Sequence, residues 1–557
     1  MFSHFLNGGL INSQSKGIAV PALILAVSSI ASRLLGILRD WLLANRFGAG
    51  EQLDVYYAAF RVPDFIYNIL IFGGITVAFL PLFSDYYASD KKSAWRFANN
   101  TLNVFFALLA LLSAALFIFT PQLMGYIAPG FSPDQTASAV FLTRLLFVSP
   151  IIFGVASIFS GILQYFKKFL AYSMGALLYN IGIIAGIVFL APSLGITGVA
   201  VGVIIGALLY WGIQIFPAFA CGFSWRPIFN LREASLGSIF KLMLPRTIGV
   251  AANQINLIVP TIIGSTLAAG SIAVFNLSNN IYSLPAGIIG VAFATAAFSE
   301  FAKYAAAGRF DQLAQKFSSA YRQIGYLAVP AAILIFILRD PIVGFLYYHG
   351  EFTLEAARLT AASLGIFCLG VYFASMMPVM FRLFFSLRDT ASPTLTTVVS
   401  VAANILMNYW FVGLLLEKNG LSAFIRSVFD LRAVGDIAVL GLPLAYVVAN
   451  ALQFALLWFL LSRKKIPLTQ IKEIVSSFFK SSAAGIFMAV AVYSTIGMLA
   501  RDQFGGDLLA LALGGIIAAA AYFGATALLR SPEIVIVARL LEKKWNKINQ
   551  KSNKNQK

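Results

Sequence analysis

The chain has 557 residues, of which 59% are hydrophobic and only 11% are charged, and its mean hydropathy is +0.84. Soluble proteins carry about 25% charged residues, so this composition excludes a soluble globular protein and predicts an integral membrane protein that crosses the bilayer many times. The formal net charge is +18, but the basic residues gather in short segments between apolar runs. They therefore indicate orientation in the membrane and contact with anionic lipid rather than nucleic acid.

The sequence argues against a zinc enzyme and against an ATP-hydrolysing enzyme. The sequence has only two histidines and two cysteines, and they are not spaced as a zinc ligand set. It also lacks a phosphate-binding loop of the Walker A type, which argues against ATP hydrolysis by this chain. We therefore expect no metal and no other cofactor.

About fourteen apolar runs are long enough to cross a bilayer, because a spanning helix needs about 20 residues. No cleavable signal precedes the first run, so we expect that run to remain in the mature protein. Basic residues recur in every second connecting segment, and the positive-inside rule then places both termini in the cytoplasm. In chain order the runs lie at residues 18–44, 55–87, 98–119, 138–165, 170–191, 196–220, 238–264, 271–304, 315–338, 355–386, 392–416, 437–461, 476–499 and 506–530.

Two stretches of the chain resemble each other at a fixed spacing. Tyr67 pairs with Tyr282 and Phe83 pairs with Phe298, in each case 215 residues apart. Equivalent spans run in the same direction, so the sequence predicts two parallel repeats, and transporters often bind their substrate between such halves. The predicted all-α membrane fold has an N-terminal lobe at 1–230, a second six-helix lobe at 231–465, a helix pair at 466–530 and a basic amphipathic cytoplasmic tail at 531–557.

The first span carries charges in its second half. Arg33, Gly36 and Asp40 share one side of the helix, and Arg39 lies on an overlapping side. A charge inside a spanning helix costs at least ~2.5–3.5 kcal/mol, so we expect these side chains to face a cavity, a partner or a ligand. The alternative for Arg39 and Asp40 is that they lie at the helix end, reach the interface and pair with each other.

Further polar residues occur in other spans. Asp54 and Arg61 lie in the predicted N-terminal lobe, and Arg246 and Asn280 lie in the second predicted lobe. Arg61 and Arg246, together with the two arginines of the first span, predict a cationic cavity between the halves, and Asp40, Asp54 and Asn280 are further candidate substrate-binding residues. Arginine suits a diphosphate because its planar fork donates two parallel hydrogen bonds to a phosphate group. The alternative is that Arg246 reaches the cytoplasmic face and that the amides only join helices.

The motifs together resemble a known family. Residues 32–40 (Ser-Arg-Leu-Leu-Gly-Ile-Leu-Arg-Asp), residues 47–50 (Phe-Gly-Ala-Gly) and Asp54 are similar to the opening signature of the MviN/MurJ lipid II flippases. These flippases belong to the multidrug/oligosaccharidyl-lipid/polysaccharide exporter superfamily. Further family motifs are matched by residues 244–246 (Leu-Pro-Arg), 350–353 (Gly-Glu-Phe-Thr), 387–390 (Leu-Arg-Asp-Thr) and Pro393, so the likeness extends over residues 18–530.

The resemblance implies fourteen transmembrane helices in two pseudo-symmetric lobes, with a C-terminal helix pair that forms a lipid-facing groove. It implies a transporter without covalent chemistry that moves lipid II, an undecaprenyl-diphosphate-linked glycopeptide, from the cytoplasmic to the outer leaflet of the bacterial inner membrane by alternating access. Membrane lipids and cell-wall synthesis proteins are the other partners it suggests. By resemblance, Arg33, Arg39 and Asp54 fall on cavity positions that matter in the family, and Arg61 stands where the family often has a lysine.

The chain also departs from the family pattern. Tyr67 and Asn68 stand where relatives often carry an arginine pair, and Asn280 stands near another frequent arginine. The expected cavity is therefore less cationic. A flippase for another polyprenyl-diphosphate-linked saccharide, a drug exporter of the same superfamily and a scaffold that recruits cell-wall enzymes stay as alternatives.

Coupling of transport to an energy source is left open by the sequence. Asn404 and Asn408 lie one helical turn apart, so their carbonyl oxygens are candidate ligands for a monovalent cation. The family's sodium site maps onto these two residues, but without a carboxylate, and joining helices is the alternative role for them. The membrane potential is the other candidate driving force, at about 2.3 kcal/mol per charge per 100 mV.

Overall fold

The computed structural model describes residues 19–464, 470–499 and 508–534, and every regular element in these ranges is a helix. This confirms the predicted all-α class. The chain divides into two compact units: residues 1–273 with 350–352, and residues 274–349 with 353–557. Most of the predicted amphipathic tail, residues 535–557, lies outside the described ranges.

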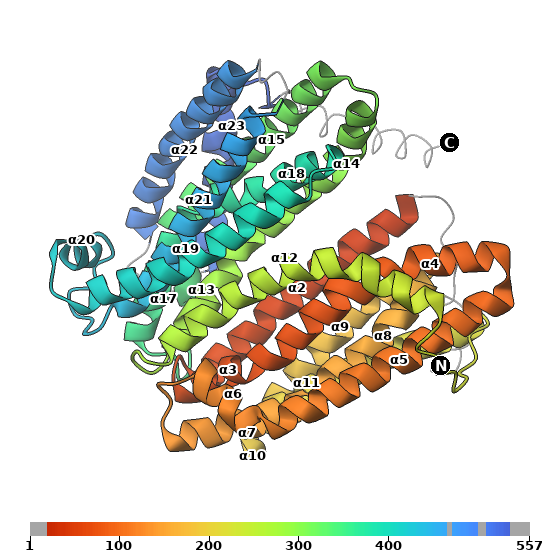
Figure 1. Ribbon diagram of the computed structural model, residues 1–557. Coiled ribbons are helices and arrows are strands. Elements are labelled where there is room, and N and C mark those ends of the chain that lie inside the picture. The colour runs from red at the N-terminus through yellow and green to blue at the C-terminus, as the bar shows by residue number, and fades with distance from the viewer. Residues whose placement is uncertain (1–18, 465–469, 500–507, 535–557) are drawn as a thin grey trace, which may run out of the picture. The chain divides into compact units, whose positions relative to one another are not determined.

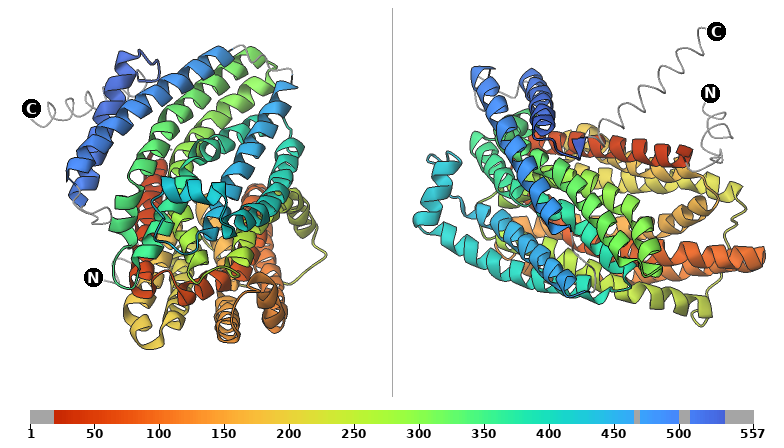
Figure 2. Two further views of the ribbon diagram at one scale, coloured as in Figure 1. Left: turned by 90° about the vertical axis from the view of Figure 1, so that its left-hand side faces the viewer. Right: turned by 90° about the horizontal axis from the view of Figure 1, so that it is seen from above.

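The first unit is a bundle in which long helices lie side by side (Figures 1 and 2). Three segments, η1, η2 and the later η3, are π-helical turns within longer helices. The elements of the first unit are α2 (Ala19–Phe47), α3 (Glu51–Ile66), η1 (Tyr67–Ile75), α4 (Thr76–Ser89), α5 (Lys91–Ile118), α6 (Thr120–Ile127), α7 (Pro133–Leu146), α8 (Val148–Tyr165), α9 (Phe169–Ala185), η2 (Gly186–Leu190), α10 (Ala191–Leu194), α11 (Ile196–Ala220) and α12 (Ala234–Gly264).

Helix α12 packs within the first unit, against η1, α3 and α4. The first unit also contains the start of α13 (Ser271–Pro285), up to Ala273. The compact units thus divide at a different place from the predicted boundary at 230/231. The predicted boundary separates the two sequence repeats, whereas the compact units are defined by packing. The boundary between the repeats stays a prediction.

Helices α9 and α11 meet along a row of glycines, with α2 packed on the other side of α9. A methyl group added at Gly182 would collide with the backbone of Gly206, and one at Gly186 would lie 2.6 Å from the Cα atom of Gly202. Small residues allow helix backbones to approach this closely, which is a common way of joining helices inside a membrane. The close approach fixes the position of α9, which carries one of the polar residues described below.

The second unit buries an aromatic and aliphatic core between α14, α15, α18 and α21. The C-terminal helices α22 and α23 pack against α15, where Arg322 forms ion pairs with Glu473 (3.1 Å) and Glu533 (3.7 Å). The remaining elements of this unit are η3 (Ala286–Gly290), α14 (Val291–Ala306), α15 (Phe310–Ile337), α16 (Arg339–Tyr347), α17 (Leu354–Cys368), α18 (Val371–Ser386), α19 (Ala391–Leu416), α20 (Gly420–Val428), the 3-10 turn η4 (Ala438–Leu440), α21 (Gly441–Ser462), α22 (Ile471–Leu499) and α23 (Leu508–Leu528).

Ten helices in the described residues are long and apolar enough to cross a membrane, and the pair α17 and α18, bent by 46°, forms an eleventh if it is one span. Three other predicted spans coincide with α2, with α3 to α4 and with α12, which carry most of the charged candidate residues. The protein is therefore a multi-pass membrane protein. These three segments contain polar side chains or have a short apolar part, unlike the ten long apolar helices. The count of fourteen spans therefore stays a prediction.

The π-helical turns agree with the predicted repeat. Residues 71–75 of η1 and Ala286–Gly290 of η3 are separated by the same 215 residues that separate Tyr67 from Tyr282. A π-helical turn inside an α-helix often marks a functional bend. Both repeats therefore carry a local irregularity at equivalent positions.

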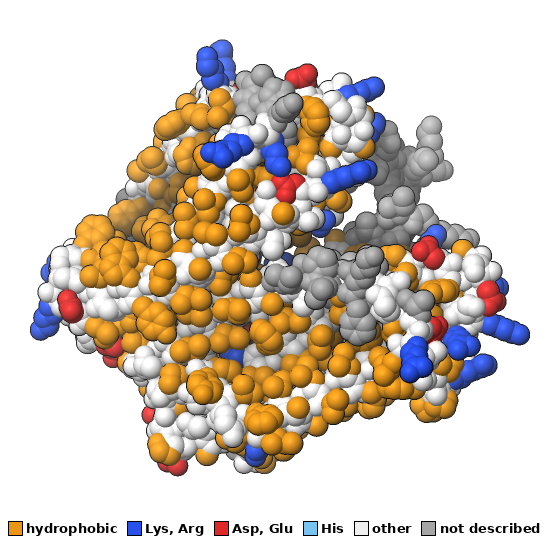
Figure 3. All heavy atoms as spheres, in the orientation of Figure 1, with side chains coloured by type: hydrophobic (Ala, Val, Ile, Leu, Met, Phe, Trp, Pro, Cys, Tyr) orange, Lys and Arg blue, Asp and Glu red, His pale blue; other side chains and the backbone are white. Residues whose placement is uncertain are grey.

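Apolar side chains cover most of the helix surface that Figure 3 shows, whereas charged side chains gather near helix ends. This distribution is expected for helices whose flanks face lipid and whose ends face water.

Candidate functional site

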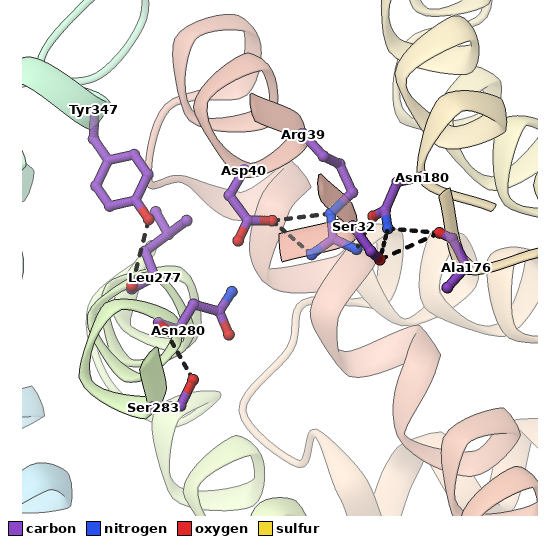
Figure 4. A network of polar contacts seen from close by, with 9 residues as sticks. All are labelled: Ser32, Arg39, Asp40, Ala176, Asn180, Leu277, Asn280, Ser283 and Tyr347. Atoms are coloured by element: carbon purple, nitrogen blue, oxygen red, sulfur yellow. Dashed lines mark hydrogen bonds and ion pairs between the residues drawn. The ribbon is translucent and has the colours of Figure 1, made fainter. Parts of the chain in front are cut away.

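Arg39 and Asp40 form an ion pair near the C-terminal end of α2. Both Nε (3.0 Å) and Nη2 (2.8 Å) of Arg39 donate to Oδ1 of Asp40, which is buried, while the Arg39 side chain keeps 25% of its surface exposed (Figure 4). The pairing that the sequence offered as an alternative is therefore present in the structure. The predicted contact of these two residues with a substrate remains a prediction.

A second contact turns Arg39 toward the interior of the first unit. Its Nη1 atom donates to Oδ1 of Asn180 on α9, at 3.4 Å. Nδ2 of Asn180 in turn donates to the hydroxyl of Ser32 (3.3 Å) and to the carbonyl of Ala176 (3.0 Å) (Figure 4). Asn180 thus joins α9 to α2 and orients the guanidinium of Arg39.

Arg33 differs from Arg39 in having no counter-charge. It is partly exposed, and no hydrogen bond or ion pair involves its side chain in the part of the chain that the structure describes. Gly36, on the same side of α2, has open space beside it, since an added methyl group would meet no atom within 4 Å. Leu34 and Leu38, on another side, are 62% and 42% exposed, as expected for residues that face lipid. One side of α2 therefore presents a cation next to open space, with no counter-charge among the residues that the structure describes.

Asp54 is buried at the start of α3 and binds backbone amides. Its Oδ2 accepts a hydrogen bond from the N–H of Gly270 (2.7 Å), and its Oδ1 accepts one from the N–H of Ala273 (2.8 Å). The carboxylate thereby satisfies two donors of the first turn of α13, where the helix dipole also favours a negative charge. In this conformation both oxygens of Asp54 are used to hold the start of α13.

The segment 350–352 also joins the first unit at this end. The N–H of Glu351 donates to the carbonyl of Asn45 at 2.9 Å, and Gly350 adopts a φ of +58° against the same residue. A side chain at Gly350 would collide with Asn45, so this position requires glycine for both conformation and space. The family motif at 350–353 therefore has a packing role in the first unit.

Arg61 connects α3 to α12. Its Nε atom donates to the hydroxyl of Thr261, which is fully buried, at 2.7 Å. Nearby, Gln254 on α12 donates to the carbonyl of Asp64 at 3.4 Å. Arg61 is therefore partly occupied in joining two helices of the first unit.

The remaining predicted residues lie elsewhere. Arg246 is on α12, but its side chain is outside the part that the structure describes. Asn280 lies on α13 in the second unit and is partly exposed, and its backbone carbonyl accepts a hydrogen bond from Ser283 at 2.9 Å (Figure 4).

The candidate cation ligands are both fully buried in α19. Nδ2 of Asn408 donates to both the backbone carbonyl (2.9 Å) and the side-chain oxygen (3.0 Å) of Asn404. Among the described residues no cluster of histidine, cysteine, aspartate or glutamate is arranged to hold a metal ion. The arrangement agrees with a role in shaping α19, and cation binding stays untested.

Comparison with known proteins identifies the family. A family model described as the lipid II flippase MurJ matches residues 43–514. The chain belongs to this family. Probable lipid II flippases MurJ from Vibrio cholerae and Rhizobium meliloti are 26% and 27% identical to it, over 75% and 88% of this chain and 83% and 90% of their own lengths. The one from Bdellovibrio bacteriovorus is 25% identical over 96% of this chain and 99% of its own length.

Solved structures agree on the fold. A lipid II flippase MurJ in an inward closed conformation has a TM-score of 0.74 at 21% identity and covers 91% of this chain and 98% of its own. An inward-facing multidrug resistance MATE transporter of the MOP superfamily has a TM-score of 0.61 at 16% identity, covering 77% and 94%. The fold is therefore that of the superfamily named from the motifs.

Two positions at which this MurJ-family chain departs from the family pattern are neutral in the structure as well. The ring of Tyr67 packs against Phe153 with 5.1 Å between centroids, and Nδ2 of Asn68 donates to the carbonyl of Asp64 at 2.9 Å. Neither residue supplies a charge to replace the arginine pair.

Sequence reasoning did not foresee the partners of the charged residues. Thr261 and Asn180, the partners of Arg61 and Arg39, lie on other helices and carry no local signal that pairs them with an arginine. A usable signal was the spacing of Ser32 and Arg39, which lie on one side of α2 and so allow a single amide on a neighbouring helix to reach both.

Proposed function

We propose that the chain is a lipid II flippase that moves the undecaprenyl-diphosphate-linked glycopeptide from the cytoplasmic to the outer leaflet of the bacterial inner membrane by alternating access. The family match over residues 43–514 carries this proposal. The relatives are probable lipid II flippases, which suggests lipid II as the substrate. The arginines of α2 can bind the diphosphate of such a lipid.

Arg33 is assigned the first contact with the diphosphate. It is partly exposed, it has no counter-charge among the described residues, and open space lies beside Gly36 on the same side of α2. A hydrogen bond between charged groups contributes about 1.5–3 kcal/mol, so loss of this side chain removes a large part of the affinity for the anion.

Arg39 is assigned a second contact that is made by exchange. Its guanidinium is held by Asp40 and Asn180, and a diphosphate competes with Asp40 for the same N–H groups. When the anion leaves, Asp40 takes its place, so the arginine is never left uncompensated in a low-dielectric setting. This exchange favours release of the substrate as well as its binding. A transporter requires both steps, whereas a protein that only binds tightly does not require release.

Transport needs no covalent step and no cofactor in this proposal. Both termini lie in the cytoplasm, as the distribution of basic loops predicts. The membrane potential acts on the charges of α2, and a monovalent cation at Asn404 and Asn408 is the alternative source of coupling. Replacing sodium by choline in a transport assay distinguishes the two, because only the cation mechanism then loses activity.

A second candidate is a flippase for another polyprenyl-diphosphate-linked saccharide. The neutral Tyr67 and Asn68, in place of an arginine pair, are the observation that favours it. Both candidates share the diphosphate contact at α2, so they differ in the sugar and not in the chemistry of the site.

Complementation of cells depleted of their own lipid II flippase tests the proposal. We expect wild type to restore growth, and Arg33→Ala and Arg39→Ala to fail although the proteins accumulate in the membrane. Arg309→Ala is the matched control, since Arg309 is exposed at the start of α15 and forms no ion pair among the described residues. Growth with both α2 arginines replaced would refute the site, and failure of well-expressed wild type would favour the second candidate.

A further inference from the structure

The first unit contains an apolar groove that the proposed transport path does not use. It has a volume of about 490 Å³, is open on one side, and lies between α5, α8 and α11. Its walls include Phe106 of α5, Ile152 and Val155 of α8, and Ile215 and Phe219 of α11, and Trp225 lies at its rim. Phe106, Phe219 and Trp225 are 48%, 48% and 59% exposed, so the opening faces outward from the unit.

The rim of the groove is held by three asparagines at the start of α5. Nδ2 of Asn99 donates to the carbonyl of Ser224 (3.0 Å), and its Oδ1 accepts from the N–H of Arg226 (2.6 Å). Nδ2 of Asn103 donates to the carbonyl of Arg226 (2.8 Å), while its Oδ1 accepts from the indole N–H of Trp225 (3.1 Å). These bonds fasten the loop that follows α11 over the start of α5.

Asn100 fixes the far end of the same loop. Its Nδ2 donates to the carbonyl of Asn230 (3.0 Å) and to Oε2 of Glu233 (2.6 Å), and its Oδ1 accepts from the N–H of Asn230 (2.7 Å). The acidic side chain at this rim is thereby engaged inside the protein. Hydrogen bonds from the side chains of α5 therefore hold this loop at both ends.

The rim is basic toward solvent. Arg226 follows Trp225 in the loop, Arg96 lies two turns before Asn103 on the same side of α5, and Arg232 lies near the far end of the loop; all three side chains are exposed and form no ion pair among the described residues. A basic loop beside a membrane attracts the anionic head groups of the cytoplasmic leaflet, at about 1 kcal/mol per basic residue. The combination of apolar walls and a cationic rim therefore matches one molecule that has both an apolar chain and an anionic head.

We propose that this groove is a binding site for one anionic glycerophospholipid of the cytoplasmic leaflet. An acyl chain lies between α5, α8 and α11, and the phosphate is held by Arg226 and Arg96. The lipid fills the side of the first unit at which α5 and α11 meet the loop. It acts as a bound structural lipid and is not the transported molecule.

Lipid retention by the purified full-length chain tests the proposal. The protein is loaded with phosphatidylglycerol or phosphatidylethanolamine of identical acyl chains, and the lipid retained per molecule is measured by native mass spectrometry. We expect one phosphatidylglycerol to be retained in preference to phosphatidylethanolamine. The double variant Arg96→Gln/Arg226→Gln should lower this preference roughly tenfold or more, whereas Arg309→Gln, an exposed arginine elsewhere, should leave it unchanged.

Two further variants separate the groove from general lipid contact. Val155→Phe fills the groove and should reduce retention of both lipids, while Val188→Phe, at an exposed apolar position on η2 outside the groove, should not. Equal retention of the two lipids by wild type, unchanged retention by Val155→Phe, or preferential retention of a polyprenyl phosphate would each overturn the proposal.

Discussion

The carboxylate of Asp54 holds the first turn of α13 through two short hydrogen bonds, and Asp54→Asn tests whether that role is structural. Asparagine keeps one acceptor oxygen but turns an NH₂ group toward the other backbone N–H, so one bond is lost and the other loses its charge assistance. Hydrogen bonds to charged groups contribute about 1.5–3 kcal/mol each. We therefore expect the free energy of unfolding to fall by about 2–4 kcal/mol.

Thermal unfolding of the purified protein in detergent measures this loss. We expect Asp54→Asn to unfold at a clearly lower temperature than wild type, and Asp54→Ala at a still lower one, because it leaves two buried donors without an acceptor. Glu51→Gln is the matched control, since Glu51 is an exposed acid of the same first turn of α3 and has no ion pair among the described residues. If Asp54→Asn unfolds at the wild-type temperature and still fails to complement, the structural reasoning is refuted and a substrate contact is favoured.

Two other perturbations follow from the packing and the charges. Gly182→Leu should prevent accumulation of folded protein, because its side chain would collide with the backbone of α11, whereas Gly212→Leu, which has open space beside it, should be tolerated; size-exclusion profiles after membrane extraction check both. Asp389 lies in the loop before α19; burial alone would raise its pKa, but hydrogen bonds from Lys464 and Ser392 outweigh this effect and hold the pKa below its ordinary value. The stability it contributes is therefore present above the ordinary aspartate pKa of about 3.9 and is lost as pH falls through the lower folded-state pKa, so the difference in unfolding temperature between wild type and Asp389→Asn should shrink only in strongly acidic buffer.

The all-α membrane fold could be predicted from the sequence because apolar runs are local signals, whereas the substrate contacts of the charged residues stay a prediction. The predicted spans at α2, at α3 to α4 and at α12 are less apolar or have a shorter apolar part than the other spans. They are the spans that carry most of the charged candidate residues. Two π-helical turns, which the sequence did not predict, are separated by the same offset as the aromatic residues of the predicted repeat.

The partners of those residues could not be predicted, because they are remote in the sequence. Asp54 binds amides 216 and 219 residues later, Arg61 binds a hydroxyl 200 residues later, and Arg39 binds an amide 141 residues later. Helical periodicity tells which side of a helix a residue occupies, but not which helix faces that side. The asparagines of α5 were a missed signal, since Asn99, Asn100 and Asn103 crowd the start of an otherwise apolar span.

The distribution of counter-charges within the first unit bears on how a diphosphate would be held. Arg39 is largely neutralised by the neighbouring Asp40, Arg61 shares its guanidinium with Thr261, and Tyr67 replaces a family arginine with a neutral ring. Arg33 then supplies, on the same side of α2 as Gly36, a positive charge for which the described residues hold no counter-charge. Under the proposed function, Arg33→Ala should weaken anion binding by deleting that charge, and Arg39→Ala should weaken it both by deleting a charge and by leaving the Asp40 carboxylate unpaired, where it repels the anion.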